Sequence, residues 1–292
     1  MTDVLGVCES WDDGVVVVRR EQGDLVEIAT ADIVSGKPVP PRPSLHRRLD
    51  PVRADLLALP GWQPVETEPL GDWLLRASGG FSSRGNSVLA LGDPGVPLDE
   101  AVERVAAWYR ERSLPPRAHV HPDSDEAAVF AGAGWETYEP TLLMLASVSR
   151  VLRRLGRRPG VAVEHATTVD QGWLASDERA GRFGEPARQV LEAGEVTFAT
   201  VRDDSGAVLA RGRAAFHDDW VGVSSLATRE DVRRTGLGSA VLRSLLDWGA
   251  ERGATTTYLQ VVVANTAAQQ LYESYGYEVH HRYDYLVLDL AT

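Results

Sequence analysis

The sequence predicts an α/β fold with a mixed sheet, preceded by a small β-rich unit. Amphipathic helical segments alternate with short runs rich in β-branched and aromatic residues, and the order helix, strand, helix, strand occurs twice. A proline-rich segment separates the first 43 residues from the rest. We therefore predict a small domain over residues 1–43 and two α/β repeats over residues 44–147 and 160–292.

Composition narrows the function and the compartment. The chain has 292 residues, 43% of them hydrophobic, which is enough for two cores. Its formal net charge of −12 repels phosphate backbones, so we expect no nucleic-acid partner. Cys8 is the single cysteine and no Cys/His cluster has zinc-site spacing, so we expect neither a disulfide nor a metal. Without a signal-peptide or membrane-span pattern, we expect a cytoplasmic chain with no membrane partner.

The small domain is expected to be antiparallel. Strands are predicted at residues 15–18, after the turn Asp12-Asp13-Gly14, and at residues 24–29. The segment Lys37-Pro38-Val39-Pro40-Pro41-Arg42-Pro43 contains four prolines, which lack amide donors, so it is predicted to be a stiff linker.

The second repeat has the clearer pattern. Its first helix follows a glycine loop, and a β-rich run over residues 255–263 comes next. A second helix ends at Gly276, and strands are expected at residues 277–280 and 283–290. The apolar faces of the two helices consist of Leu237, Ala240, Val241, Leu245 and Trp248, and of Ala268, Leu271, Tyr272 and Tyr275.

The first repeat has the same order of elements. A helix is followed by a strand near residues 117–120, a short helix to Gly132, and Gly134-Trp135. The face of that first helix consists of Ala101, Val102, Val105, Trp108 and Tyr109. The alternative is that two α/β segments share this order by chance. A basic helical connector is expected over residues 148–158, ending at Pro159-Gly160.

A glycine loop in the second repeat is suited to binding phosphate groups. A strand over residues 220–228 leads through a turn to Gly236-Leu237-Gly238-Ser239, which opens the amphipathic helix. Backbone amides at a helix N-terminus attract phosphate, and glycine permits positive φ and close approach. The bare pattern Arg-x-x-Gly-x-Gly is weak evidence, but a second pattern follows it, Asn265-x-x-Ala268-x-x-Leu271-Tyr272-x-x-x-Gly276-Tyr277.

With these two motifs the sequence resembles the GNAT superfamily of acyl-CoA N-acyltransferases over about 130 residues. The resemblance implies a GNAT fold, acetyl-CoA as co-substrate and an amine acceptor as the other partner. It implies that the backbone of Leu226, Ala227 and Thr228 pairs with the pantetheine arm, and that Asn265 lies beside it. The residues implied to hold the pyrophosphate are Arg233, Arg234, Thr235, Gly236, Leu237, Gly238 and Ser239.

The whole chain also resembles an actinobacterial subfamily in which a Src-homology-3-like barrel precedes two tandem GNAT repeats, and some of whose members are called histone-acetyltransferase-like. Two segments carry this likeness, the proline-rich linker and Phe81-Ser82-Ser83-Arg84-Gly85-Asn86-Ser87-Val88. Members usually have a further strand before the point where this chain begins, so the barrel is expected to be incomplete.

The first repeat departs from the family pattern at its loop. Leu91-Gly92-Asp93-Pro94-Gly95-Val96-Pro97 stands in the loop position, where the prolines donate no hydrogen bond. Phe130 stands four residues before Gly134, where Tyr272 stands four before Gly276. We therefore expect a degenerate repeat that plays a structural role.

The resemblance implies that Tyr272 faces the thioester sulfur and is the acid that protonates the departing thiolate, with a core aromatic as the alternative. The general base is not identifiable, because the strand over 220–228 has no carboxylate. Residues in segments that could border the acceptor pocket, each more simply a solvated loop residue, are Glu185, Asp218, Asp219, His280 and His281. Ordered water is an equal alternative, and residues 173–192 are expected to shape the acceptor pocket.

Three classes of function remain open. The leading class is an N-acetyltransferase that acts on a small amine or a peptide amine by direct attack in a ternary complex. The second is a non-catalytic acyl-CoA sensor or scaffold, and the third is a protein-interaction module that recruits partners through the small domain.

Overall fold

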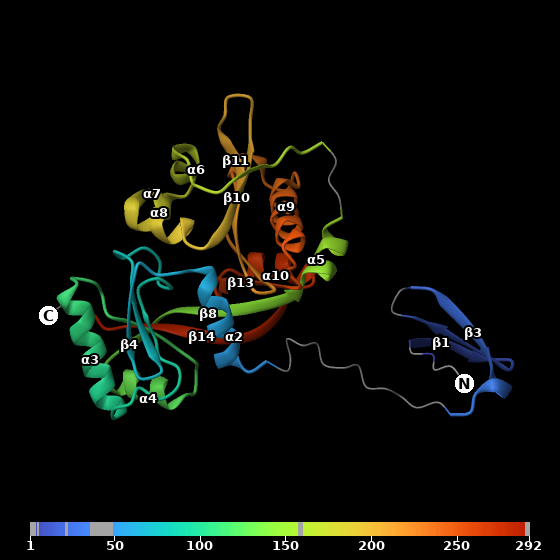
Figure 1. The fold of residues 1–292 in the computed structure, drawn as a ribbon, viewed down its shortest axis with the longest axis horizontal. Coiled ribbons are helices and arrows are strands. Elements are labelled where there is room, and N and C mark those ends of the chain that lie inside the picture. The colour runs from blue at the N-terminus through green and yellow to red at the C-terminus, as the bar shows by residue number, and fades with distance from the viewer. Residues whose placement is uncertain (1–3, 5, 21–22, 36–48, 157–159, 290–292) are drawn as a thin grey trace. The chain divides into compact units, whose positions relative to one another are not determined.

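The computed structural model describes residues 4, 6–20, 23–35, 49–156 and 160–289. The chain divides into two compact units, residues 1–44 and 45–292 (Figure 1). In the described residues, no helix is long and apolar enough to cross a membrane.

The small unit is a three-stranded antiparallel sheet. Its strands are β1 (Val7–Asp12), β2 (Val15–Arg19) and β3 (Leu25–Ala29), in that order across the sheet. Gly14 has a φ of 81° in the turn between β1 and β2, where a side chain would be strained. The predicted strands are confirmed, but the described residues form an open sheet and not a closed barrel. The predicted linker over residues 37–43 lies outside the described residues.

The large unit contains one sheet of eleven strands. Its strands are β4 (Glu66–Leu70), β5 (Trp73–Ala77), β6 (Val88–Leu89), β7 (Arg117–Val120), β8 (Glu136–Ser147), β9 (Glu164–Ala166), β10 (Glu195–Arg202), β11 (Val208–His217), β12 (Trp220–Thr228), β13 (Thr256–Val262) and β14 (Glu278–Val287). Its helices are α2 (Pro51–Ala58), α3 (Leu98–Glu111), α4 (Asp125–Gly132), α5 (Val148–Leu155), α6 (Gln171–Ser176), α7 (Glu178–Phe183), α8 (Glu185–Glu192), α9 (Leu237–Glu251) and α10 (Thr266–Ser274).

The two repeats share this sheet by exchanging their last strands. The strand order is β4-β5-β6-β7-β14-β8-β13-β12-β11-β10-β9. The last strand of the second repeat, β14, pairs with β7 of the first, and the last strand of the first repeat, β8, pairs with β13 of the second. Strands β8 and β14 also pair with each other. The predicted α/β fold with a mixed sheet is confirmed.

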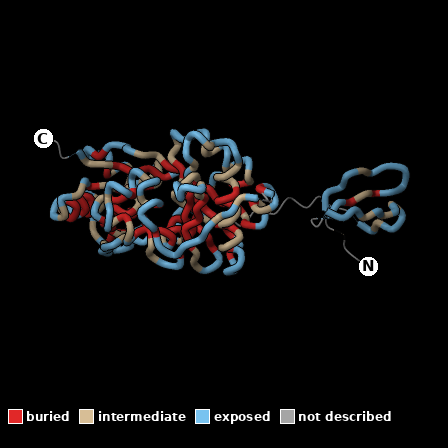
Figure 2. Tube along the Cα trace, turned by 90° about the horizontal axis from the view of Figure 1, so that it is seen from above, coloured by how far each residue is buried: buried red, intermediate tan, exposed pale blue. Residues whose placement is uncertain are grey.

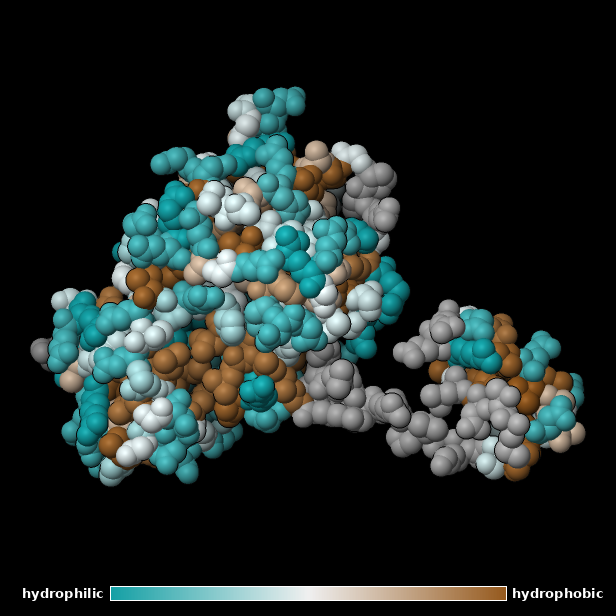
Figure 3. All heavy atoms as spheres, in the orientation of Figure 1, coloured by the Kyte–Doolittle hydropathy of each residue, from teal (hydrophilic) through white to brown (hydrophobic). Residues whose placement is uncertain are grey.

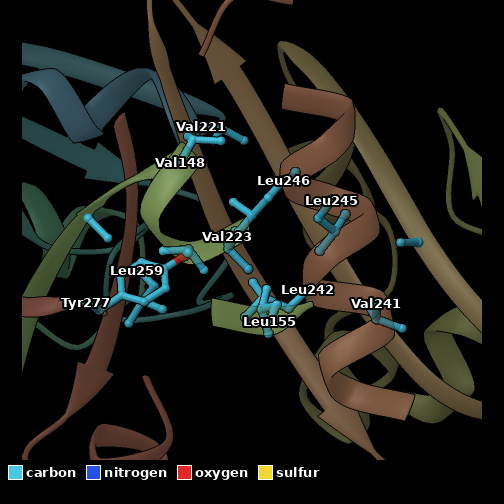
Figure 4. Packing of buried hydrophobic residues seen from close by; sticks show 14 of the residues in the cluster. Val148, Leu155, Val221, Val223, Val241, Leu242, Leu245, Leu246, Leu259 and Tyr277 are labelled. Atoms are coloured by element: carbon cyan, nitrogen blue, oxygen red, sulfur yellow. The ribbon is translucent and has the colours of Figure 1, made fainter. Parts of the chain in front are cut away.

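Helices cover both faces of the sheet. Alternate residues of β8 point to opposite faces: Met144 packs with α5 and α9, whereas Leu143 packs with α2. Figure 4 shows Val241, Leu242 and Leu245 of α9 against the strands. Trp62, just after α2, packs with α6, α7 and α8 on the second face. Figure 2 shows buried residues running through the large unit, and Figure 3 shows a largely hydrophilic surface with an apolar area near α2.

Several predicted elements are confirmed, and one prediction was wrong. The strand predicted at residues 220–228 is β12, and the apolar face of the first helix of the first repeat is buried in α3. The two strands predicted at 277–280 and 283–290 are instead one strand, β14, because β-bulges at two positions let it bend without breaking. The connector helix α5 ends at Leu155, followed by Gly156 with a φ of 62°.

Candidate functional site

The loop before α9 presents a row of unpaired backbone amides. Gly236 is the N-cap of α9 and has a φ of 92°, and Arg234 also has a positive φ, of 65°. Among the described residues, none accepts a hydrogen bond from the amides of residues 234–239. Six adjacent donors at the positive end of a helix dipole are suited to binding an anion such as a phosphate group.

Two parallel strands separate next to this loop. β12 and β13 pair only from Trp220 to Gly222 and from Thr256 to Tyr258, so their later residues have free inner edges in the described structure. A register shift between β11 and β12 marks a bulge in β12 at Ser225, whose φ is 52°. Strands that separate in this way could accommodate the extended pantetheine arm that the sequence analysis predicts between them.

The bulge is fixed by a buried arginine. Arg211 donates from Nη1 to the carbonyl oxygen of Ser225 at 2.5 Å, and its Nη2 lies 3.1 Å from an oxygen of Asp177. Burial lowers the pKa of Arg211, and Asp177 opposes that shift. This arginine therefore links α6 and α7 to the irregular part of β12.

The end of β12, the loop and the start of α9 form one continuous surface. Arg233 donates from Nε to the carbonyl of Thr228 at 3.3 Å, and a Cβ on Gly238 would lie 2.8 Å from Thr228 Oγ1. The structure thus brings together the residues predicted to bind the cofactor on β12 and α9. Leu226 packs its side chain into the core, and Ala227 is exposed.

Asn265 has a structural role that the sequence motif did not reveal. It is the N-cap of α10, where its side chain accepts from the amide of Ala268 at 3.2 Å. It is exposed, and its amide donates to the carbonyl of Val262, the last residue of β13, at 2.9 Å. Asn265 therefore lies at the end of β13 where the pantetheine arm was predicted to run between β12 and β13.

Tyr272 lies half-buried on α10. Its ring packs edge-on against Tyr277 with 5.7 Å between centroids. Burial, with a smaller contribution from Tyr275, raises the pKa of Tyr272 to about 12. The phenol is therefore protonated at neutral pH, as a proton donor must be.

In the corresponding loop of the first repeat, Pro94 and Pro97 have no amide hydrogen and two further amides are already paired. The amide of Asp93 donates to Asp72 at 3.0 Å and the amide of Gly95 donates to the side chain of Asp93 at 2.8 Å. Two carboxylates therefore occupy this loop, and they would repel a phosphate. Phe130 is fully buried in the core.

The histidines considered as loop residues lie elsewhere. His280 and His281 are part of β14, and His281 contacts Asp55 at 3.1 Å, so that expectation was wrong. Asp218 and Asp219 are exposed in the turn before β12, about 30 Å along the strand from Thr228. Glu185 is exposed at the start of α8.

The sequence did not reveal two polar groups of the structure. Glu139 on β8 accepts a hydrogen bond from Ser83 at 3.0 Å and lies 4.0 Å from Arg179. Asp55, His119 and His121 form a second group, on the face of the sheet that α2 covers. Spacing could not have shown that group, because the histidines lie 64 and 66 positions from Asp55.

Comparison with known proteins agrees with this geometry. Residues 52–286 match the family described as "Probable histone acetyltransferase Rv0428c C-terminal". The Mycobacterium tuberculosis protein "Probable histone acetyltransferase Rv0428c" is 30% identical, over 98% of this chain and 89% of that protein.

Solved structures share the fold. A GCN5-related N-acetyltransferase from Kribbella flavida has a TM-score of 0.59 and 19% identity, covering 85% of this chain and 96% of that one. A tandem GNAT protein from the clavulanic acid biosynthesis pathway has a TM-score of 0.54 and 13% identity, covering 78% of this chain and 84% of that one.

Proposed function

The chain belongs to the Rv0428c C-terminal family of GNAT acyl-CoA N-acyltransferases, and on that premise we propose that it transfers the acetyl group of acetyl-CoA to a primary amine. The acceptor is a small molecule or a peptide, and attack occurs directly in a ternary complex. The observation that supports this most strongly is the row of six unpaired amides at residues 234–239, beside the splayed strands β12 and β13.

In this proposal the second repeat, residues 160–292, holds acetyl-CoA and the first, residues 44–147, does not. The pyrophosphate would accept from the amides of the Gly236 loop, with the exposed Arg233 and Arg234 adding positive charge. The pantetheine arm would extend between Thr228 and Asn265. In the first repeat the amides of Asp93 and Gly95 already donate to carboxylates, and this repeat contributes the strand β8 that pairs with β13.

The proposed reaction needs an acid and a base. The neutral amine attacks the thioester carbonyl, the new C–N bond forms, and collapse of the tetrahedral intermediate breaks the C–S bond. Tyr272 would donate its phenolic proton to the departing thiolate. The proton lost by the amine would pass to a carboxylate or a water at the opposite side, and no metal takes part.

We propose Glu139 as that base. It belongs to β8, and the next residue, Pro140, accepts from the amide of Val263 at 2.8 Å, which places Glu139 beside the end of β13. Its contacts are Ser83 and, at 4.0 Å, Arg179 of α7, within the segment expected to shape the acceptor pocket. Asp177 is the less suitable carboxylate, because Arg211 already pairs with it.

A panel of amines tests the proposed function. Purified full-length chain is incubated with acetyl-CoA and single amines, and the release of free CoA thiol is followed. The panel includes lysine-rich peptides, because the Mycobacterium tuberculosis relative is named a histone acetyltransferase and a net charge of −12 favours cationic acceptors. Amine-dependent thiol release supports catalysis, whereas tight acetyl-CoA binding without release for any amine favours a non-catalytic sensor.

A further inference from the structure

Three histidines converge on one buried carboxylate oxygen. Nε2 of His119, His121 and His281 lie 3.2, 2.8 and 3.1 Å from Oδ2 of Asp55. The donor atoms of Asp55, His119 and His121 all lie within 4.8 Å of one another. In a tetrahedral site with metal–ligand distances of about 2.0–2.1 Å, neighbouring donors are roughly 3.3 Å apart. The donor atoms of Asp55, His119 and His121 are therefore close enough to share one ion, and His281, which lies outside this group of three, contacts Asp55 and could supply a fourth ligand.

These residues come from segments that are far apart in the sequence. His119 and His121 project from the same face of the chain at β7, because side chains two apart on an extended segment point the same way. His281 comes from the neighbouring strand β14, and Asp55 comes from α2, which covers this face. Three separate segments thus meet at one point.

His280 connects Leu49 to His281. Its Nε2 lies 2.9 Å from the carbonyl oxygen of Leu49, and its Nδ1 lies 2.8 Å from Nδ1 of His281. The other ring nitrogen of His281, Nε2, faces Oδ2 of Asp55.

The charge of Asp55 needs a partner. Its side chain is 2% exposed, and within the described part of the chain no arginine nitrogen lies within 4.0 Å of it. Its other oxygen, Oδ1, is buried without a hydrogen-bond partner among those residues. A divalent ion would neutralise this carboxylate and could also contact Oδ1.

The surroundings hold the rings in place. His119 stacks on Tyr283 with 3.9 Å between centroids and 9° between planes. His280 orients His281 and is itself tied to Leu49. A hydrogen-bond partner on the second ring nitrogen orients the imidazoles of metal sites, and His281 has one, whereas Nδ1 of His119 has none among the described residues.

We propose that Asp55, His119, His121 and His281 bind one Zn²⁺ ion in a structural site that fixes α2 to β7 and β14. Three imidazoles and one carboxylate are a suitable ligand set for Zn²⁺, and four protein ligands leave no open position for catalysis. This proposal departs from the expectation of no metal, which considered only the spacing of Cys and His along the chain.

Zinc content and thermal stability test the site together. Full-length chain is loaded with ZnSO₄, dialysed against metal-free buffer and analysed by mass spectrometry for metal, and its Tm is measured with and without EDTA. We expect about one Zn²⁺ per chain. We also expect Tm to be roughly 5–10 °C higher with Zn²⁺ at a hundredfold excess over Kd.

Variants identify the ligands. His121→Ala removes the most exposed of the three imidazoles, and Asp55→Asn keeps the shape of the carboxylate but not its charge. Both should lose the zinc and the EDTA-sensitive rise in Tm. His165→Ala is the matched control, because His165 bonds to the hydroxyls of Thr197 and Ser244 and should leave zinc content unchanged.

The proposal is wrong if the wild type retains no zinc after dialysis and EDTA leaves its Tm unchanged. It is also wrong if His121→Ala and Asp55→Asn retain as much zinc as His165→Ala. If both variants fail to fold, Co²⁺ is substituted into the wild type and its visible absorption is measured. A four-coordinate Co²⁺ site absorbs strongly and would support the proposal, whereas the weak absorption of a hydrated surface ion would contradict it.

Discussion

The hydroxyl oxygen of Ser239 lies 2.7 Å from the phenol oxygen of Tyr275. Ser239 is in the first turn of α9, behind the glycine loop, and Tyr275 caps the C-terminal end of α10. This hydrogen bond joins the helix proposed to bind phosphate to the helix that carries Tyr272. It also provides a second phenol, three residues from Tyr272, with which the proposed acid can be compared.

The substitution Tyr272→Phe should lower kcat by about 10²-fold, because it removes the proton donor for the thiolate and keeps the aromatic ring. KM for acetyl-CoA and the free energy of unfolding should change little. Steady-state kinetics with the best amine of the panel provide the measurement. Tyr275→Phe is the control, and its kcat should stay within about threefold of the wild type.

An active but destabilised Tyr272→Phe variant would contradict a catalytic role for Tyr272. That outcome would assign Tyr272 to the core, against which its ring packs.

The raised pKa of Tyr272 predicts how kcat responds to alkaline pH. An ordinary tyrosine loses its proton near pH 10, but at a pKa of about 12 the phenol stays protonated and able to donate. We therefore expect kcat to be flat or rising from about pH 8 to about pH 10.5. A decline in kcat centred near pH 10 would contradict a buried tyrosine as the acid.

Glu139→Gln should lower kcat/KM by roughly 10²-fold if Glu139 removes the amine proton, because glutamine keeps the size but cannot accept the proton. Glu136→Gln, an exposed residue on the same strand, is the matched control. Equal activity of the two variants would indicate that water, and not Glu139, removes the amine proton.

Arg211→Ala should destabilise the chain by about 2 kcal/mol, because it leaves the half-buried Asp177 without its partner and frees the carbonyl of Ser225. Arg229→Ala breaks an exposed pair with Asp231, which solvent and salt screen, and should cost much less stability. Urea unfolding measures both. Similar losses would show that the bulge does not depend on Arg211.

Local patterns in the sequence predicted much of this fold. The apolar spacing of α3 and α9, the strand β12 and the glycine before α9 are properties of short segments, so one sequence reveals them. The exchange of β8 and β14 between repeats is not local, because it depends on which distant edges pair. The contacts of Asp55 with three histidines are hidden for the same reason.

The same distinction between local patterns and distant contacts applies to the candidate site residues. The motif marked residues 233–239 because backbone conformation limits which residues a tight loop accepts. It also marked Asn265, whose N-cap bond to Ala268 explains the asparagine without any cofactor. Glu139 was missed because its position beside β13 follows from strand pairing between the two repeats.

Calorimetric titration of the full chain with acetyl-CoA tests the central claim most directly, which is that the Gly236 loop of the second repeat alone holds the cofactor. We expect about one site per chain in the wild type and none in Gly236→Val, since valine would strain a φ of 92° and obstruct the phosphate. Gly206→Val provides the matched control, because Gly206 has a φ of 84° in open space, and it should bind like the wild type. Two sites per chain, or undiminished binding by Gly236→Val, would contradict the account.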